Sequence, residues 1–486
     1  MQQAGYTPRL TGGGSSGGRG ASPVIWQRFI ERVAEDPDRV AVIHDAGEVG
    51  YAALAAEAEA IAARLPGLAG PRPGRVVVRE ADPFAVLVRV LACWRCGLSA
   101  VVLRDSMTPQ QVAEIVGWLR PAALLDGPIE ASGVGGVQNL PFAARDEALV
   151  ICTSGTTGVP KLVALPAESV CLNAATIAAA LGLGPSDRVA VNTPLGYMYG
   201  LMGGCLAAVL AGASCRLFRP RDPLTQLQGA IRHEGITVVQ GPPSLFRLFM
   251  AYWNGEPFPG VRVVTTGGEP LSADLAADLG RAFPNARRLF LYGMTEAGPR
   301  LSHLAFEEGG GVDGCVGIPY SHVEWRLDPV AGSDAGRLVL RGPGMFLGYI
   351  TAAGGYEGLD EAGCFQSNDL LNRDAAGRLH FRGRIDRIFR SGGRLVNPDA
   401  IERVLTSQPS IEDAVCQAEP HAILGLVPVA EVVLRRGATF DPTALMAACA
   451  TQIEPHAVPR RIVQTDAGGL AESGKRRRPK NSGPQT

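Results

Sequence analysis

One stretch decides the fold of this chain: Ile151-Cys152-Thr153-Ser154-Gly155-Thr156-Thr157-Gly158-Val159-Pro160-Lys161. From Thr153 onward it holds four hydroxyl side chains, two glycines and a lysine within nine residues. The apolar run 148–151 before it predicts a buried strand. Glycines let backbone N–H groups turn toward a ligand, and hydroxyls and a lysine donate to anionic oxygens. The stretch therefore predicts a loop that binds a polyphosphate. A Ser/Thr/Gly surface turn is the alternative; a Walker A loop is excluded because the G-x-x-x-x-G-K-[ST] spacing is absent.

The bulk composition indicates a cytosolic globular protein with several domains. A chain of 486 residues predicts about two to four domains or subdomains. Hydrophobic residues make up 46% and charged residues 19%, which fits a large core. The net charge of −1 gives no global field that would favour nucleic acid or a membrane. The N-terminus lacks the apolar segment of a signal peptide, so the ten cysteines are expected to be reduced.

Two local patterns offer other interpretations. Cys93-Trp94-Arg95-Cys96 has the spacing of a redox or metal site, but it lies in a mostly apolar run and no second pair follows. Buried core cysteines are therefore favoured. The uncharged segment 189–215 is long enough for a transmembrane helix and contains G-x-x-x-G spacing. Because Pro194 and several glycines interrupt its first half, a buried strand, loop and helix are favoured instead.

The first part of the chain alternates strands and helices. Residues 1–22 are rich in Gly and Ser and predict a flexible tail; their G-x-G-x-x-G match has no strand before it, which argues against a dinucleotide site. Apolar periodicity then predicts, in order, a helix at 24–33, a strand at 40–43, a helix at 51–65, a strand at 75–78, a helix at 84–96, a strand at 100–103 and a helix at 108–119. Thr108 and Gln111 provide a capping box for the last helix. This alternation predicts an α/β fold with layered parallel strands.

Three further predicted strands each end in a glycine-containing loop. The strand 238–240 ends at Gly241, 261–265 ends at Thr266-Gly267-Gly268-Glu269-Pro270, and 289–291 ends at Tyr292-Gly293-Met294-Thr295-Glu296. Ligands of open parallel sheets bind at the carboxyl ends of the strands, so these loops are expected to form one site. The backbone at 267–269 and the Tyr292 ring would be the two walls of a slot for a planar base. A carboxylate beside phosphates favours Mg²⁺, which assigns the metal to Glu296.

Taken together, these motifs resemble the adenylate-forming superfamily of acyl- and aryl-CoA synthetases, peptide-synthetase adenylation domains and luciferases. The resemblance runs from about residue 23 to 480. It rests on T-S-G-T-T-G-x-P-K at 153–161, Y-G-M-T-E at 292–296, Gly363-Cys364-Phe365-Gln366-Ser367-Asn368-Asp369-Leu370, Gly383-Arg384-Ile385-Asp386 and Ser473-Gly474-Lys475. The family pattern has Thr-Gly where this chain has Ser367-Asn368; since Asn tolerates positive φ, a turn is expected to survive there.

The resemblance implies a role for each motif residue. Lys475, Glu296 and Thr156 would be catalytic, with the lysine serving the α-phosphate. Asp369 would accept both ribose hydroxyls, and Asp386 would be the pivot of a mobile C-terminal domain. The remaining ATP-binding residues would be Thr153, Ser154, Gly155, Thr157, Gly158, Lys161, Gly267, Gly268, Glu269, Pro270, Tyr292, Gly293, Thr295 and Arg384. Without the resemblance, residues 475–480 would be interpreted as a basic tail.

The acid pocket is expected near Tyr197, Tyr199, Gly241 and Met294. Tyr197 stands where acyl- and aryl-activating relatives often have a histidine, and ordinary packing is the alternative for both tyrosines. Peptide-synthetase domains usually carry an aspartate nearby that pairs with the α-ammonium of the substrate. No acidic residue lies between Asp187 and Asp222, and an unpaired buried ammonium is costly. A standard α-amino acid is therefore disfavoured.

The resulting prediction is a stand-alone ligase of three parts: a large domain at 23–384 with layered α/β subdomains and a β-rich subdomain, a hinge at 385–387, and a small α+β domain at 388–486. It would use Mg·ATP to convert an aryl or medium acyl acid into an acyl-adenylate with release of pyrophosphate. The acyl group would then pass to coenzyme A or to the thiol of a separate carrier protein. One alternative is adenylation of a small anion such as nitrite, with an amine as acceptor. Another is a non-catalytic nucleotide-binding relative.

Overall fold

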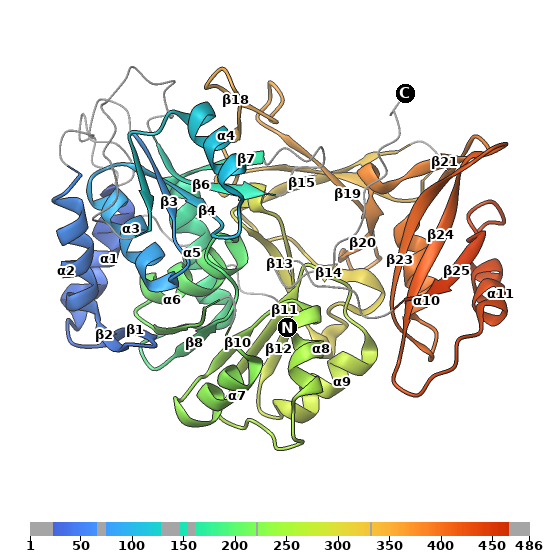
Figure 1. The fold of residues 1–486 in the computed structure, drawn as a ribbon, viewed down its shortest axis with the longest axis horizontal. Coiled ribbons are helices and arrows are strands. Elements are labelled where there is room, and N and C mark those ends of the chain that lie inside the picture. Colours follow the sequence, from blue (N-terminus) through green and yellow to red (C-terminus); the bar gives the residue numbers. More distant parts are fainter. Residues whose placement is uncertain are drawn as a thin grey trace.

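The fold is described from a computed structural model for residues 23–65, 74–127, 146–153, 161–219, 222–330 and 333–465. Four β-sheets and the helices packed on them make up this part of the chain (Figure 1). Every helix within these ranges is too short or too polar to span a bilayer. The buried strand and helices predicted for 189–215 are confirmed, except that most of the helical part has π geometry.

The largest sheet has eight strands in the order β13-β12-β11-β10-β8-β9-β1-β2. From β12 to β1 all neighbours are parallel, and only the two edge strands run antiparallel to their neighbours. The predicted parallel layering is thereby confirmed. The strands are β13 Arg300–Ala305, β12 Arg287–Gly293, β11 Val263–Gly267, β10 Val238–Gln240, β8 Arg188–Val191, β9 Ser214–Leu217, β1 Val40–His44 and β2 Gly47–Gly50.

The second sheet has seven strands in the order β18-β17-β7-β6-β4-β3-β5. The section from β6 to β5 is parallel, whereas β7, β17 and β18 add an antiparallel half. The strands are β18 Tyr356–Glu357, β17 Gly348–Ile350, β7 Lys161–Pro166, β6 Glu147–Thr153, β4 Ser99–Leu103, β3 Arg75–Arg79 and β5 Ala123–Asp126.

Helices cover both faces of these two sheets. One hydrophobic core joins the inner faces of both sheets to α1, α2, α3, α5 and α6, so these helices lie between the sheets. Helices α7, α8 and α9 pack on the outer face of the eight-stranded sheet, and α4 packs on the outer face of the other. The helices are α1 Pro23–Glu35, α2 Tyr51–Ala62, α3 Pro83–Arg95, α4 Pro109–Leu119, α5 Ala167–Leu181, α6 Ala207–Leu210, α7 Leu224–His233, α8 Pro243–Ala251 and α9 Ala273–Ala282.

Local sequence explains where several of these helices begin. Asp82 accepts a hydrogen bond from the N–H of Phe84 and caps α3, whose first residue is a proline. The predicted capping box of α4 is confirmed, because Thr108 and Gln111 each bond the other's backbone N–H. Cys93 is fully buried in α3 and burial raises its pKa, while Cys96 is only partly buried; both are free thiols.

A third, antiparallel sheet has five strands in the order β14-β20-β19-β16-β15. It includes β19, and there the structure corrects the expectation of a turn at Ser367-Asn368. Both residues lie within a nine-residue strand, and Asn368 does not adopt a positive φ. The Ser367 hydroxyl donates to the Leu338 carbonyl at 2.8 Å and holds the segment in the sheet. The strands are β14 Cys315–Gly317, β20 Leu379–Arg384, β19 Phe365–Arg373, β16 Gly336–Arg341 and β15 Glu324–Pro329.

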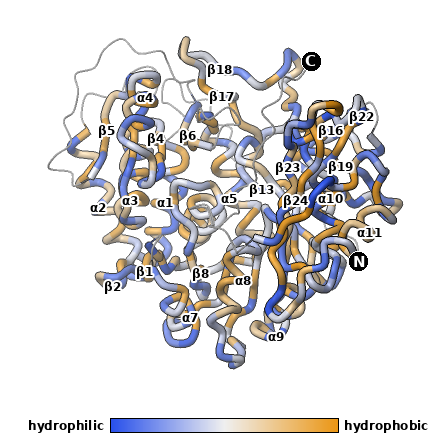
Figure 2. Tube along the Cα trace, turned by 45° about the vertical axis from the view of Figure 1, so that its right-hand side comes forward, coloured by the Kyte–Doolittle hydropathy of each residue, from blue (hydrophilic) through white to orange (hydrophobic). Residues whose placement is uncertain are grey.

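The C-terminal part of the described chain forms a sheet of its own with a separate hydrophobic core, at one end of the molecule (Figure 1). Its strand β24 is largely hydrophobic (Figure 2). The predicted hinge 385–387 forms a 3₁₀ turn, Ile385–Arg387, between β20 and this sheet. The elements are β21 Phe389–Ser391, β22 Arg394–Val396, α10 Pro398–Thr406, β23 Ile411–His421, β24 Gly425–Leu434, α11 Pro442–Gln452 and β25 Arg461–Gln464.

Candidate functional site

Three neighbouring parallel strands, β10, β11 and β12, bring their glycine-containing loops to one edge of the eight-stranded sheet. A Cβ at Gly267 would overlap the carbonyl oxygen of Leu291, and a Cβ at Gly293 would overlap that of Pro299. Only glycine fits at these two positions, because the neighbouring backbone approaches so closely. The result is a flat backbone wall next to the Tyr292 ring, which suits a planar base.

Tyr292, Asp369 and Arg384 form a connected cluster beside that wall. The Tyr292 hydroxyl donates to Oδ2 of Asp369 at 2.6 Å, and Nη1 of Arg384 donates to Oδ1 at 3.0 Å. Burial raises the pKa of Asp369, and the charge of Arg384 offsets part of that increase. Burial and the neighbouring Asp369 also raise the pKa of Tyr292, so the phenol keeps its proton. Each carboxylate oxygen retains a further lone pair, so Asp369 can still accept from a ligand hydroxyl.

Arg384 also connects this cluster to the predicted hinge. Its Nε and Nη2 donate to both oxygens of Asp386, at 2.9 and 3.0 Å. Its backbone N–H donates at 3.1 Å to Asp399 in the first turn of α10. Burial lowers the pKa of Arg384, but its bonds to Asp386 and the charge of Asp369 outweigh burial and raise it. The C-terminal sheet is therefore joined to the cluster through a continuous set of charged hydrogen bonds.

Lys161 and Glu296 approach each other through a residue that the sequence did not single out, Tyr349. The Tyr349 hydroxyl donates to Oε1 of Glu296 at 2.6 Å, and Nζ of Lys161 lies 4.4 Å from the Tyr349 ring centroid. Strand β17 places Tyr349 opposite Val163, two residues from Lys161. The last residue of the polyphosphate stretch thus lies close to the proposed metal ligand. The two groups fit a magnesium–phosphate complex, in which phosphate oxygens supply most of the ligands.

The donor set supports a metal held jointly with a nucleotide. Among the residues that the structure describes, no three His, Cys, Asp or Glu side chains gather as a metal site of their own. Glu296 would then give one oxygen to Mg²⁺, and phosphate oxygens would complete its coordination. The metal would neutralise charge on the phosphates, while Tyr349 fixes the orientation of the Glu296 carboxylate.

Several predicted site residues lie outside the described residues: Ser154, Gly155, Thr156, Thr157, Gly158 and Lys475. The two ends of the polyphosphate stretch are described. Thr153 and Lys161 face each other at the ends of the antiparallel strands β6 and β7, and the Thr153 hydroxyl donates to the Lys161 carbonyl at 3.3 Å. Thr295 begins a 3₁₀ turn, Thr295–Ala297, directly after Met294. Glu269 accepts from the N–H and the hydroxyl of Ser244, both at 2.9 Å, and so holds the start of α8 beside the loop.

The predicted acid-pocket residues separate into two groups. The Tyr199 hydroxyl donates to the Thr265 carbonyl at 3.3 Å, and the Gly241 N–H donates to the same carbonyl at 3.1 Å. Tyr199 and Gly241 are therefore neighbours at the ends of β10 and β11. Tyr197 instead accepts from Nη1 of Arg104 at 3.3 Å, and its ring lies under the same guanidinium. Met294 is partly buried at the end of β12.

A π-helix, Tyr199–Leu206, forms one side of this acid-side region. Its wider turn leaves backbone groups that an α-helix would use internally. The side-chain amide of Gln240 donates to the Gly203 carbonyl at 3.3 Å and accepts from the Gly204 N–H at 3.2 Å. A Cβ at Gly204 would overlap that amide, so a larger residue there would have to displace the Gln240 side chain. The end of β10 is thereby fixed against the helix.

Sequence reasoning missed Arg300 and Gln240 as well as Tyr349. Arg300 is the first residue of β13, lies opposite Gly293 and is 4% exposed. Its signal in the sequence was an isolated charge between the Y-G-M-T-E motif and an apolar strand. Gln240 offered a similar signal, as a polar residue at the end of the apolar run 238–239. Tyr349 gave none, because its partners are distant in sequence.

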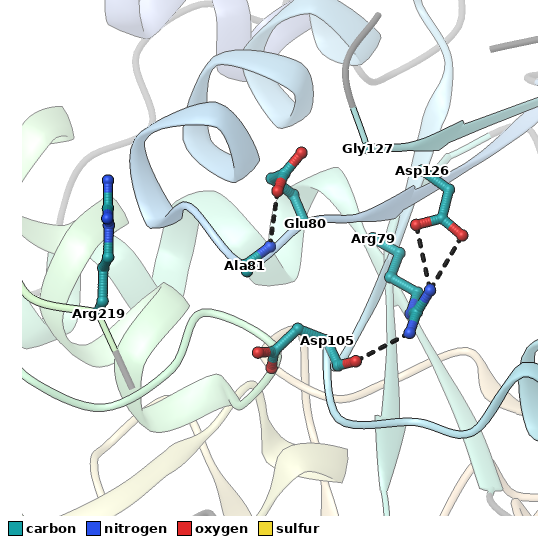
Figure 3. A pocket seen from close by; sticks show the side chains of 7 residues that line it. All are labelled: Arg79, Glu80, Ala81, Asp105, Asp126, Gly127 and Arg219. Carbon is teal, nitrogen blue, oxygen red and sulfur yellow. Dashed lines mark hydrogen bonds and ion pairs between the residues drawn. The ribbon is translucent and has the colours of Figure 1, made fainter. Parts of the chain in front are cut away.

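A second concave region lies at the carboxyl ends of β3, β4 and β5 (Figure 3). It is lined by Arg79, Glu80, Ala81, Asp105, Asp126, Gly127 and Arg219. Arg79 donates to both oxygens of Asp126, at 3.2 and 3.0 Å, and to the backbone carbonyls of Asp105 and Met107. The charge of Arg79 is therefore neutralised within the protein.

The order of the motifs and the two-part fold define the class of this protein as ATP-using, adenylate-forming enzymes. The chain belongs to the AMP-binding enzyme family, whose model matches residues 29–139 and 127–350. The model of the AMP-binding enzyme C-terminal domain matches residues 400–475. The chain is thus an AMP-forming, acyl-CoA synthetase-like enzyme, as the motifs predicted.

Individual relatives agree with this assignment. The chain is 28% identical over 478 residues to a feruloyl-CoA synthase of Amycolatopsis sp, covering 92% of this chain and 96% of the relative. Among solved structures it resembles ATP-bound MatB of Rhodopseudomonas palustris, with a TM-score of 0.79 and 22% identity over 93% of this chain and 97% of the other. MenE of Bacillus subtilis, an o-succinylbenzoate CoA synthetase solved with its acyl-adenylate intermediate, has a TM-score of 0.76 and 22% identity, covering 92% and 96%. These likenesses confirm the predicted α/β fold with a separate C-terminal domain.

Proposed function

We propose that this enzyme activates an aryl or medium acyl acid with Mg·ATP and passes the acyl group to a thiol, coenzyme A or that of a separate carrier protein. In the first half-reaction a carboxylate oxygen attacks the α-phosphorus and pyrophosphate leaves. In the second, the thiol sulfur attacks the acyl carbon and AMP leaves. The relatives with CoA-ligase names support the coenzyme as acceptor.

The observation that carries the proposal is the meeting of Lys161, Glu296 and Tyr349 next to the Tyr292–Asp369–Arg384 cluster. The first group suits the phosphates and Mg²⁺, and the second suits the ribose and the base. Glu296 and Arg384 both act on the pKa of Tyr349, so the two groups adjoin. A nucleotide bound across them would place its α-phosphate near the ends of β10 to β12. Catalysis would then consist mainly of positioning and charge neutralisation.

The acid site supports a substrate other than a standard α-amino acid. The part of the π-helix region that is described, 188–219, carries no carboxylate that could pair with an α-ammonium. The groups around Tyr199 are instead a glutamine, glycine backbone and the guanidinium of Arg300. A cationic substrate would be repelled there, whereas an anion is favoured.

The decisive test is pyrophosphate release with Mg·ATP, screened over benzoates, cinnamates, medium-chain acids and nitrite. Release with an aryl or acyl acid, followed by thioester formation with coenzyme A, is the expected result. Release with nitrite alone would assign the enzyme to small-anion adenylation. A lack of release with every compound would contradict the proposed activity and favour a nucleotide-binding relative.

Lys475 is tested in the same assay. Lys475→Ala is expected to abolish pyrophosphate release while leaving ATP binding and the thermal midpoint close to those of the parent. Lys480→Ala is the matched control, because it removes the same charge further along the basic segment. Equal pyrophosphate release by the parent and Lys475→Ala would remove this lysine from the catalytic role.

A further inference from the structure

Arg300 differs from every other buried arginine that the structure describes. Five arginines are at least 95% buried: Arg75, Arg89, Arg216, Arg300 and Arg387. The other four each pair with a carboxylate, from Glu147, Glu80, Glu234 and Glu402 respectively. Within the described ranges Arg300 has no carboxylate partner, and its Nη1 is buried without any hydrogen-bond partner. A buried charge without a partner is costly, so such a group calls for an explanation.

Among the residues that the structure describes, none supplies a negative charge to Arg300 at neutral pH. His303, Tyr199 and Tyr320 are its titratable neighbours. Burial, together with the charges of Arg300 and Arg287, lowers the pKa of His303 to about 4. Burial raises the pKa of Tyr320 to about 12 and also raises that of Tyr199. At neutral pH the histidine and both tyrosines are uncharged, so the guanidinium lacks a counter-ion.

The guanidinium lies on the acid side of the site. A methyl group placed at Gly203 would lie 3.6 Å from Nη2 of Arg300 and 3.8 Å from the Gln240 amide, in ordinary van der Waals contact with both. Gly203 therefore leaves room for at least a methyl group between its own backbone and the cation. In the sheet, β10 with Gln240 is two strands from β12 with Tyr292, which corresponds to about 10 Å. The Arg300 backbone lies opposite Gly293, next to Tyr292, and its side chain extends from there toward Gly203 and Gln240.

Building on the proposed function, we propose that Arg300 binds a second anionic group of the acid, remote from the carboxylate that reacts with ATP. The preferred substrates are accordingly dianions, dicarboxylic acids above all. The planar guanidinium matches a carboxylate with two parallel hydrogen bonds, and Gln240 and Tyr199 line the same place. The free enzyme keeps an unpaired cation, and the distal carboxylate of the substrate neutralises it.

The experiment compares matched acids that differ in one distal carboxylate: benzoate with terephthalate, and hexanoate with adipate. Pyrophosphate release and KM are measured for the parent, Arg300→Gln, Arg300→Lys and the surface control Arg281→Gln. The parent is expected to prefer the dianion of a pair. Arg300→Gln should lower kcat/KM for the dianion on the order of 10- to 100-fold, mainly through KM, and change the value for the monoanion little. Arg300→Lys should keep part of the preference, and Arg281→Gln all of it.

Each outcome decides between distinct possibilities. Turnover of monoanions with no preference for dianions, and an unchanged ratio in Arg300→Gln, would overturn the role of Arg300 and leave the proposed function intact. An equal loss for both members of a pair would show that Arg300 binds the reacting carboxylate instead, and would also overturn the proposal. If no acid of any kind releases pyrophosphate, the proposed function itself fails. Thermal melts and ATP binding show which variants are folded. Gly203→Ala, which places a methyl group beside an intact Arg300, provides a second test. It should lower kcat/KM for the dianion and change the value for the monoanion little.

Discussion

On the proposed nucleotide side of the site, Arg384 pairs with both Asp369 and Asp386 through hydrogen bonds of 2.9 to 3.0 Å, whereas on the proposed acid side Arg300 has no anionic partner among the described residues. The Arg384 guanidinium is paired with carboxylates before any ligand binds. Under the proposal, the Arg300 guanidinium gains an anionic partner only when the substrate binds. Under the proposed function, this difference would place substrate specificity on the acid side. The pre-paired cluster would bind the same nucleotide in every reaction, whereas the unpaired Arg300 would discriminate between acids.

The largest contrast is expected in stability. Arg75 is as buried as Arg300 but is paired with Glu147 at 2.9 Å. Arg75→Met leaves that carboxylate buried without a cation and should cost about 3–5 kcal/mol of unfolding free energy. Arg300→Met removes an unpaired charge and should leave stability unchanged or raise it. Denaturant unfolding of both variants is the measurement. A loss of similar size in Arg300→Met would make Arg300 a structural residue and erase the contrast.

The nucleotide cluster is tested by Asp369→Asn. The substitution keeps the shape of the side chain but removes the negative charge that accepts from Tyr292 and Arg384. We expect kcat/KM for ATP to fall about 100- to 1000-fold, as for loss of one preorganised polar contact to a reacting complex. The exposed Asp38→Asn makes the same chemical change on the surface and is the matched control. Unaltered ATP kinetics in Asp369→Asn would separate this cluster from the nucleotide.

The positive field of the acid side should be visible in the pH dependence of stability. The pKa of His303 is about 4 in the folded protein, against about 6.5 in an unfolded chain. The unfolded state therefore binds the proton more readily, so His303 lowers stability as pH falls from about 6.5 to about 4. Compared with His303→Gln, the parent should lose on the order of 2–3 kcal/mol more between pH 7 and pH 4. Parallel stability curves for the two proteins would show that His303 does not titrate in this way.

Tyr349→Phe should have the smallest effect of the set. It removes the hydroxyl that donates to Glu296 at 2.6 Å but keeps the ring beneath Lys161. Loss of a group that orients a metal ligand weakens metal binding about tenfold or somewhat more. The apparent KM for Mg²⁺ should rise accordingly, while the preference between mono- and dianionic acids stays the same. A change in that preference would contradict the separation of the two sides.

The contrast between the two sides also explains what could be predicted from the sequence. The strands predicted at 238–240, 261–265 and 289–291 correspond to β10, β11 and β12, because buried parallel strands are continuous apolar runs that end in glycine-rich loops. Asp369 and Arg384 stand in motifs whose order is informative by itself. The turn expected at Ser367-Asn368 was wrong: both residues lie within β19, at an irregularity in its pairing with β16 between Gln366 and Leu370.

Contacts between residues distant in the sequence could not be predicted from the sequence. Tyr349 meets Glu296 53 residues away, and Arg300 meets the π-helix through Gly203, so neither pair has a local pattern. That Arg300 has no carboxylate partner within the described ranges is a property of the packed structure and has no counterpart in the sequence. Tyr197 was placed in the acid pocket by motif position, yet its described contact is Arg104, from the loop after β4.

Because Tyr199–Leu206 is a π-helix, insertion or deletion of a single residue would change the geometry of the acid side. A π turn contains about one residue more than an α turn, so deletion of one residue would restore α geometry and rotate the preceding residues by about 100°. Tyr199 would then leave Thr265, and Gly203 would no longer face Arg300. One insertion or deletion in evolution can thus exchange the acid that is accepted, while the loops that hold the nucleotide stay unchanged.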